Sequence, residues 1–163
     1  MALSVVVFDV GETLVAEATT YERWEADGVT PPPAFEERDL HPDALPCLAA
    51  LRDRGLRLGA AGNMRAVHEE FLRSHLDFVG SSERWGVEKP GAGFFEKIVE
   101  EARAPAGDIL YVGDRVDNDV VPALATGLRA VRIRRGAHAQ VESPPGTVTI
   151  DSLAELPEAL ERV

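Results

Sequence analysis

The chain has 163 residues, of which 45% are hydrophobic, and a formal net charge of -11 at pH 7. This length and composition are typical of one compact globular domain and argue against a coiled coil or a disordered chain. The negative charge argues against nucleic acid or an anionic membrane as the main partner, because both would repel the average surface field.

The first residues and the cysteine content bear on location and packing. Neither a basic region nor a long apolar run occurs near the N-terminus, so no signal peptide and no membrane span are expected, and a cytoplasmic location is predicted. Cys47 is the only cysteine and cannot form an internal disulfide. It lies among leucines on the apolar face of an expected helix and is predicted to fill the core.

Short apolar runs alternate with amphipathic segments, which is typical of parallel strands buried between helices. Strands are expected at 4–8, 56–61, 108–112, 128–133 and 147–150, with a short one near 78–80. Helices are expected near 42–53, 65–75, 93–102, 118–125 and 152–162. The pattern predicts a single domain over residues 1–163, with an open, mainly parallel, Rossmann-like α/β sheet and helices on both faces.

Residues 15–41 interrupt this alternation. They contain three consecutive prolines at 31–33, several acidic residues, and the aromatic residues Tyr21 and Trp24, without clear periodicity. We expect a short helical turn followed by an irregular excursion, with Trp24 packed against the domain.

Three polar or glycine positions directly follow expected strands. Asp9 follows the first strand, Gly62 the second and Asp114 a later one. In open α/β sheets, ligands bind beyond the carboxyl ends of the strands. The sequence therefore predicts that these three strand ends converge on one site, at which Asp9 presents a carboxylate nucleophile.

Four segments resemble, in order, the signatures of the haloacid dehalogenase (HAD) superfamily. Residues 4–14 are similar to the Asp-x-Asp-x-Thr signature, with Gly11 in place of the second aspartate. Residues 60–63 are similar to the second signature, with Gly62 in place of a Ser or Thr. Residues 85–90 resemble the Lys-Pro signature, and residues 109–119 the Gly-Asp-x4-Asp signature. The resemblance in fold covers nearly the whole chain.

The resemblance implies a Mg2+-dependent, phosphatase-like hydrolase in which Asp9 forms an aspartyl phosphate. The implied metal ligands are Asp9, the main-chain carbonyl of Gly11 and Asp114, because Mg2+ prefers a few carboxylates, a carbonyl and waters. Asp119 would support the metal or Lys89. Lys89 would neutralise Asp9 and the incoming phosphate. Gly62, Asn63 and Lys89 are the implied phosphate-binding residues, with main-chain N–H groups at the start of the next helix contributing.

The missing second aspartate bears on the chemistry, since that residue is the usual general acid and base of the superfamily. Its loss is expected to lower the rate by about 10²- to 10⁴-fold. Aryl or acyl phosphates, whose leaving groups need little protonation, would suffer least in the first step, and the aspartyl phosphate would accumulate. Glu12, next to the gap, is a candidate replacement.

The interval 15–41 is far shorter than a full HAD helical cap, so the resemblance implies a near-capless or short-cap member. Specificity would then fall to loops or to a second subunit acting as a lid, which makes a homodimer one alternative. The implied substrate is a phosphorylated compound, either a small molecule or a macromolecule.

Other functions remain as alternatives. Phosphonoacetaldehyde-type cleavage uses a cap lysine, and residues 15–41 contain none. Haloacid dehalogenation also uses an aspartate nucleophile without the second acid, but the family's dehalogenases enclose the halide with a substantial cap. A catalytically impaired binding or regulatory module is favoured by Gly11 and Gly62. The retained Asp9, Lys89, Asp114 and Asp119 oppose that reading.

The remaining charged candidates carry weaker signals. No two histidines have metal-ligand spacing, and surface or capping roles are expected for His41, His68, His75 and His138. Arg132, Arg134 and Arg135 follow or end the fourth long apolar run, where they either attract an anionic substrate or lie in a solvated loop.

Overall fold

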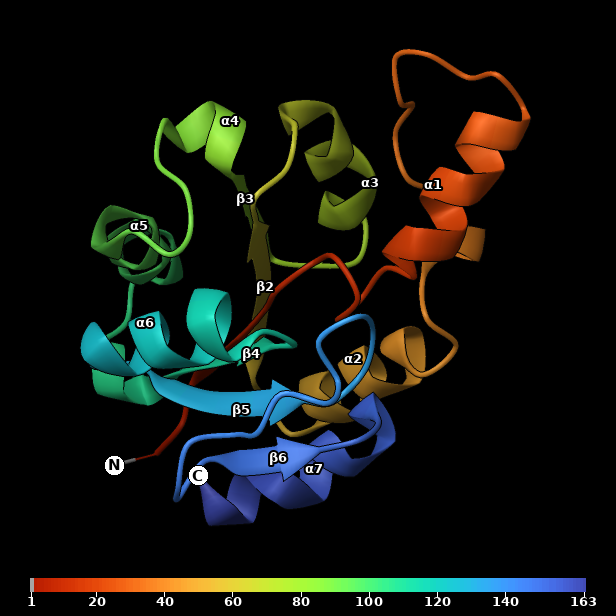
Figure 1. Cartoon of the computed structure of the whole chain (residues 1–163). Coiled ribbons are helices and arrows are strands. Elements are labelled where there is room, and N and C mark those ends of the chain that lie inside the picture. Colours follow the sequence, from red (N-terminus) through yellow and green to blue (C-terminus); the bar gives the residue numbers. More distant parts are fainter. Residues whose placement is uncertain (1) are drawn as a thin grey trace.

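A computed structural model describes residues 2–163 and contains one six-stranded sheet in the order β3-β2-β1-β4-β5-β6 (Figure 1). All neighbouring strands are parallel. The strands are β1 (Val5–Phe8), β2 (Arg57–Gly62), β3 (Phe78–Ser81), β4 (Ile109–Gly113), β5 (Arg129–Ile133) and β6 (Val148–Ile150). Every predicted strand is confirmed, with ends displaced by about one residue, within the usual boundary error.

The sheet is covered on both faces by helices (Figure 1). The α-helices are α1 (Glu17–Ala26), α2 (Ala44–Asp53), α3 (Glu69–Arg73), α4 (Ser82–Trp85), α5 (Ala92–Ala102), α6 (Val121–Ala125) and α7 (Leu156–Ala159). Short 3-10 turns occupy Glu37–Asp39, Ala66–His68, Ala106–Asp108, Leu153–Glu155 and Leu160–Arg162, and a π-helical turn occupies Val116–Val120. This layered arrangement confirms the predicted α/β class.

Three predicted helices are broken rather than continuous. The segment 118–125 consists of the π-helical turn followed by α6, and the segment 152–162 contains α7 between two 3-10 turns. Pro122 and Pro157 lie in the first turns of α6 and α7. Proline is tolerated there, because the first N–H groups of a helix have no partner within the helix, so each proline marks the start of a new helical segment. The segment 65–75 likewise divides into a 3-10 turn and α3, and α4 was not predicted.

Two apolar clusters follow the alternation of side chains along the strands. Val6 and Phe8 of β1 belong to one cluster, with residues of α2, α3 and α7, and Cys47 is buried there as predicted. Val5 and Val7 belong to the other, with residues of α5 and α6. Because the central strands β1 and β4 are buried on both sides, the sheet holds its carboxyl-end loops on a rigid base.

The chain leaves β1 and returns through an insertion that projects from the sheet at α1 (Figure 1). The predicted helical turn is a ten-residue helix, α1. Trp24 of α1 is 5% exposed and stacks on Phe35 at 5.8 Å and on His68 at 6.1 Å between ring centroids. The packing of Trp24 is confirmed, whereas the surface or capping role predicted for His68 is wrong, because these rings bury it.

Among residues 2–163, no helix is both long and apolar enough to cross a membrane.

Candidate active site

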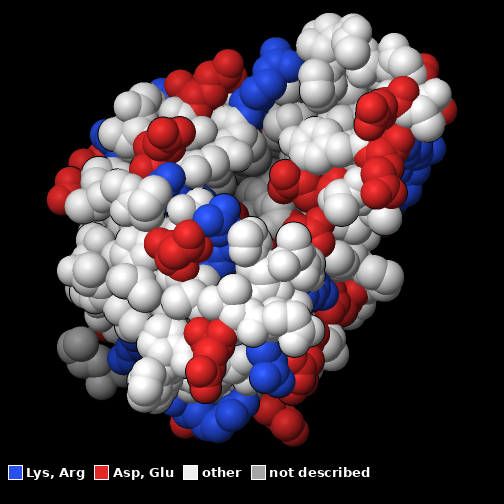
Figure 2. All heavy atoms as spheres, viewed as in Figure 1, with Lys and Arg blue, Asp and Glu red and all other residues white. Residues whose placement is uncertain are grey.

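A pocket of about 640 Å³ lies at the carboxyl ends of β1, β2 and β4, under the start of α1. Figure 2 shows the hollow between the projecting insertion and the body of the domain. In the sheet order, β1 lies between β2 and β4, so the connections from β1 and β4 diverge at this edge. Such a switch point is where open α/β sheets bind ligands. Asp9, Gly62 and Asp114 all line the pocket, as the sequence predicted.

Asp9 is held immediately after β1. Its N–H donates to the carbonyl of Val112 at 2.8 Å, which continues the pairing of β1 with β4. Its carboxylate accepts hydrogen bonds from Thr13 Oγ1 at 3.2 Å and Lys89 Nζ at 2.6 Å. Thr13 is fully buried, so the loop that follows β1 folds back on the carboxylate it presents. The sequence analysis gave Thr13 no role, although its spacing of four residues from Asp9 was visible.

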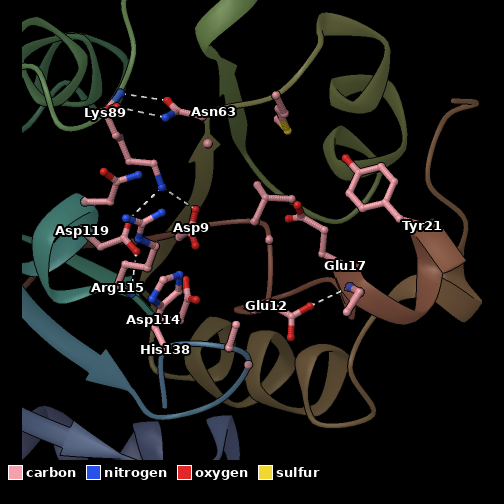
Figure 3. A pocket seen from close by; sticks show the side chains of 18 of the residues that line it. Asp9, Glu12, Glu17, Tyr21, Asn63, Lys89, Asp114, Arg115, Asp119 and His138 are labelled. Atoms are coloured by element: carbon pink, nitrogen blue, oxygen red, sulfur yellow. Dashed lines mark hydrogen bonds and ion pairs between the residues drawn. The ribbon is translucent and has the colours of Figure 1, made fainter. Parts of the chain in front are cut away.

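Lys89 joins two carboxylates inside the domain. Its side chain is 4% exposed, and Nζ lies 2.6 Å from Asp9 and 2.7 Å from Asp119 (Figure 3). Burial alone would lower the pKa of Lys89, but the adjacent negative charges raise it well above its ordinary value. Lys89 is therefore a fixed cation beside Asp9.

Asn63 positions the main chain of Lys89. Its Oδ1 accepts from the Lys89 N–H at 2.8 Å, and its Nδ2 donates to the Lys89 carbonyl at 3.1 Å (Figure 3). Both ends of the amide are thus paired, and a phosphate contact from Asn63 would come from its main chain. A Cβ atom on neighbouring Gly62 would lie 3.6 Å from Asp9 Oδ1, so this position borders the Asp9 carboxylate directly.

Three carboxylates gather at the strand ends. Asp9, Asp114 and Asp119 each offer an oxygen within 4.8 Å of the others, and all three residues are buried. Asp119 also accepts from the Arg115 N–H at 2.9 Å and approaches β4 closely. A Cβ atom on Gly113 would lie 2.4 Å from Asp119 Cγ, which explains the glycine of the fourth signature.

The charge balance of this cluster fits a bound cation. Burial and the proximity of Asp9 raise the pKa of Asp114 to about 9, and the same two causes raise the pKa of Asp119 to about 6. One lysine therefore does not neutralise the cluster. A hard divalent ion among carboxylate oxygens would supply the missing positive charge, and the oxygen-only donor set suits Mg2+.

The space beside Gly11 is filled by a residue that the sequence analysis did not single out. A Cβ atom on Gly11 would lie 1.8 Å from Glu17 Oε2. Glu17 is in the first turn of α1 and lines the pocket (Figure 3). Burial, followed by the charges of Asp9 and Glu12, raises the pKa of Glu17 above its ordinary value. No sequence spacing signals this approach, because the chain turns between the two positions.

Glu12 is engaged elsewhere. Its Oε1 accepts from the Ala18 N–H at 3.0 Å, so this carboxylate holds the first turn of α1 (Figure 3). Glu12 has a φ of 61°, a left-handed conformation uncommon for a residue with a side chain. Its carbonyl accepts from Arg135 Nε at 2.8 Å. Glu12 therefore shapes the loop, and its carboxylate is directed to the helix.

The three arginines at the end of β5 have structural partners rather than an open anion site. Arg132 is fully buried and donates to the carbonyls of His138 and Val141. Arg134 pairs with Asp151 at 2.8 Å on the surface. Arg135 ties the loop after β1 to Asp43, with Nη1 at 2.8 Å from that carboxylate. Arg132 is therefore buried, and Arg134 and Arg135 are held in ion pairs, so none of the three presents an unpaired guanidinium to an anionic substrate.

The other polar candidates divide between surface and pocket. Asp117 pairs with Arg115 at 2.7 Å and points to solvent. His138 is partly buried and lines the pocket beside Asp114 (Figure 3), so its predicted surface role is incomplete.

A sequence profile described as HAD-hydrolase-like matches residues 87–156, which include Lys89, Asp114 and Asp119. The chain is HAD-like in this matched segment and in its fold. This HAD-like chain is 36% identical over 108 residues to the glyceraldehyde 3-phosphate phosphatase of Methanopyrus kandleri, a match that covers 63% of the chain and 46% of that protein. It spans about half the length of the curated relatives it matches.

Solved structures agree on the HAD fold. The HAD phosphatase from Thermococcus onnurineus superimposes with a TM-score of 0.75 at 22% identity, covering 99% of this chain and 100% of that one. The Bacillus subtilis protein YfnB, bound to magnesium, gives a TM-score of 0.77 at 15% identity, covering 98% and 99%. At these identities the likeness concerns the fold, so the chemistry must be argued from the residues of this HAD-like chain.

Proposed function

We propose that this HAD-like protein is a Mg2+-dependent phosphomonoesterase in which Asp9 is the nucleophile. The observation that carries the proposal is the position of the Asp9 carboxylate, which faces the pocket while it is bound by Lys89 Nζ at 2.6 Å and by Thr13 Oγ1 at 3.2 Å. Such an arrangement fixes a carboxylate for attack and places a cation where the charge of a phosphate would arrive. A decayed binding module would not need it.

The metal-holding residues would be Asp9 and Asp114, with the main-chain carbonyl of Gly11 as the third protein ligand. Asp119 stays bound to Lys89 and to the Arg115 N–H, and so supports the cluster. A bound Mg2+ would supply charge neutralisation for the carboxylates and the phosphate. The YfnB structure, which has the same fold, is bound to magnesium, and this supports Mg2+ as the ion to test.

Within the chain, each residue has a separate task. Thr13 and Lys89 orient Asp9, and Lys89 offsets negative charge at the incoming phosphate. Asn63 fixes the segment that carries Lys89 through its two main-chain hydrogen bonds. A phosphate oxygen would meet the Lys89 ammonium and the main chain at Gly62 and Asn63.

For the substrate class, we propose small phosphomonoesters such as triose phosphates. The pocket of about 640 Å³ falls in the range of small-molecule sites. Several of the relatives are named glyceraldehyde 3-phosphate phosphatase, which makes that ester the first substrate to try. The pocket is partly roofed by α1, so a small ester could be held without a larger cap.

The test is phosphate release from glyceraldehyde 3-phosphate and from p-nitrophenyl phosphate, each with Mg2+ or with EDTA. We expect Mg2+-dependent release by the intact protein, and a loss of at least about 10³-fold in Asp9→Asn, since a positioned nucleophile acts with its neighbours as a unit. The matched control is Asp117→Asn. It also removes one carboxylate charge, but from a solvent-facing side chain that forms an ion pair with Arg115.

Background release by the intact protein with both esters would contradict the phosphatase proposal. Equal release by the intact protein and by Asp9→Asn would do the same, because the activity would then not come from this site. Chloride release from a 2-haloacid, measured alongside, would instead support dehalogenation.

A further inference from the structure

Phosphoester cleavage by a carboxylate nucleophile needs a proton carrier. An alkoxide leaving group must be protonated as its bond to phosphorus breaks, and the water that hydrolyses the aspartyl phosphate must lose a proton. Gly11 has no side chain to do this, and the carrier must therefore come from another part of the pocket.

Most titratable groups lining the pocket are already engaged. Lys89 bridges Asp9 and Asp119, and Asp119 also accepts a main-chain hydrogen bond. Asp114 belongs to the carboxylate cluster, and the Glu12 side chain caps α1. These contacts hold the four side chains in the carboxylate cluster and at the start of α1.

Glu17 is placed differently. Its carboxylate occupies the space beside Gly11, with Oε2 at 1.8 Å and Oε1 at 3.7 Å from the position of an added Cβ atom. Gly11 is two residues beyond Asp9, so this space adjoins the nucleophile. Glu17 lines the pocket, and no hydrogen bond or ion pair to its carboxylate occurs within residues 2–163. Its oxygens are thus available to a ligand.

The start of α1 is anchored, which gives the Glu17 side chain a defined origin. The N–H of Glu17 donates to the main-chain carbonyl of Val15 at 2.9 Å, and the preceding Ala16 N–H donates to the main-chain carbonyl of Asp39 at 2.8 Å. Asp39 is buried and also accepts from Thr20 and Arg23 of α1. A side chain on such a support can be held near reacting atoms.

We propose that Glu17 is the general acid and base of this site, a carboxylate supplied by α1 in place of a side chain at Gly11. The proposal rests on the phosphatase function proposed above. It assigns to α1 a catalytic contribution, in addition to its part in roofing the pocket.

The proton steps balance over one turnover. An Asp9 oxygen bonds to phosphorus as the ester P–O bond breaks, and protonated Glu17 gives its proton to the departing oxygen, which leaves as an alcohol. Glu17, now a carboxylate, takes a proton from water while the water oxygen bonds to phosphorus. The bond between phosphorus and Asp9 then breaks, inorganic phosphate leaves, and Glu17 is protonated as at the start.

The first experiment compares the intact protein with Glu17→Gln, which keeps the shape but cannot exchange the proton. With glyceraldehyde 3-phosphate, we expect kcat to fall by about 10²- to 10⁴-fold. With p-nitrophenyl phosphate, the leaving group needs little protonation, so we expect a burst of p-nitrophenol close to one per protein molecule, followed by slow turnover. A purely structural role would lower both phases together and would give no burst.

Glu22→Gln is the matched control, because it removes the same charge from an exposed position of α1. It should retain the rates of the intact protein on both esters. Rates of Glu17→Gln within about threefold of an active intact protein, without a burst, would overturn the inference and leave the phosphatase function standing. An intact protein that hydrolyses neither ester would overturn both.

A position swap tests the spatial claim. Glu17→Ala empties the space beside Gly11, and Gly11→Asp added to it returns a carboxylate from the other side of that space. We expect the double variant to regain at least about tenfold of the rate lost in Glu17→Ala, consistent with proton-transfer catalysis. A double variant as slow as Glu17→Ala, with equal thermal stability, would count against the equivalence of the two positions.

Discussion

At the residue scale, the site is dominated by carboxylates held closer than their charges favour. Asp9, Asp114 and Asp119 share one small volume, and Lys89 is the only cation that contacts two of them among the described residues 2–163. Residues arranged in this way favour ligand binding over stability, which is common at functional sites. The excess of negative charge should therefore be visible in the stability of the metal-free protein.

We predict that Asp114→Asn stabilises the metal-free protein, increasingly so as pH rises. Burial and Asp9 raise the pKa of Asp114 from 3.8 to about 9 in the folded protein. Between these values the unfolded chain releases a proton that the folded protein keeps, so the free energy of unfolding of the intact protein falls with rising pH. Asparagine has no such proton. Thermal unfolding in EDTA at several pH values measures the difference, with about 2–4 °C in Tm for each kcal/mol.

The same two proteins, the intact chain and Asp114→Asn, should also differ in how their Tm responds to Mg2+. The ion should raise the Tm of the intact protein, because a ligand of the folded state stabilises it, and it should have little effect on Asp114→Asn. Asp117→Asn is the control. A Tm difference that stays constant across pH, or an equal response of both proteins to Mg2+, would argue against the charge cluster.

Some of these site residues could be predicted from sequence patterns, and others could not. Asp9, Lys89, Asp114 and Asp119 were predicted because each lies in a segment whose strand, glycine and loop pattern resembles a family signature. Their mutual distances agree with the predicted convergence, while their catalytic and metal-binding roles remain predictions. Glu17 could not be predicted, because it meets Gly11 only after α1 folds over the pocket.

At the element scale, the sequence predicted α1 only as a short helical turn. The central strands β1 and β4 are continuous apolar runs buried on both sides, and such runs are recognisable without tertiary information. In contrast, α1 is largely polar, and its attachment depends on the stacking of Trp24 with Phe35 and His68. A lone histidine gives no sign of burial until the rings that cover it are placed around it.

This attachment leads to a prediction for Trp24→Ala. Removing a buried tryptophan from a stack usually costs about 3–5 kcal/mol, and here the loss falls on the segment that positions Glu17. We expect a lower Tm and a fall in kcat on glyceraldehyde 3-phosphate. With p-nitrophenyl phosphate, a burst of p-nitrophenol followed by slow turnover should appear, as expected for Glu17→Gln, because Asp9 and Lys89 lie on the sheet side of the site.

The control for this variant is Val29→Ala, which removes an exposed apolar side chain from the same insertion. It should leave both the Tm and kcat close to those of the intact protein. Slow turnover without a burst in Trp24→Ala would show that the insertion supports Asp9 as well, contrary to the expected division.

At the scale of the whole molecule, the net charge of -11 opposes the approach of an anionic ester. Figure 2 shows acidic side chains across the face that contains the hollow. A charged protein surface alters the encounter rate of a charged ligand, and salt screens that effect. The site must therefore attract phosphate through short-range contacts, at Lys89 and a bound ion, against the average field.

We predict that kcat/KM for p-nitrophenyl phosphate rises about two- to threefold as KCl is increased from about 20 mM to about 200 mM at constant free Mg2+, because screening weakens the repulsion. The change should appear mainly in KM. A fall in kcat/KM over this range would indicate that local positive charge, rather than the net negative charge, governs the approach of the substrate.

The site is divided between the sheet, which carries Asp9, and α1, which carries Glu17, so local opening of the fold can separate the two. Proteins open locally in units that are less stable than the whole, and a small insertion attached by one aromatic stack and a few polar contacts is such a unit. Release of α1 alone would leave Asp9 able to accept phosphate and remove the group that promotes its hydrolysis. The protein would then pass from a turnover enzyme to a single-use phosphate acceptor while its sheet stayed folded.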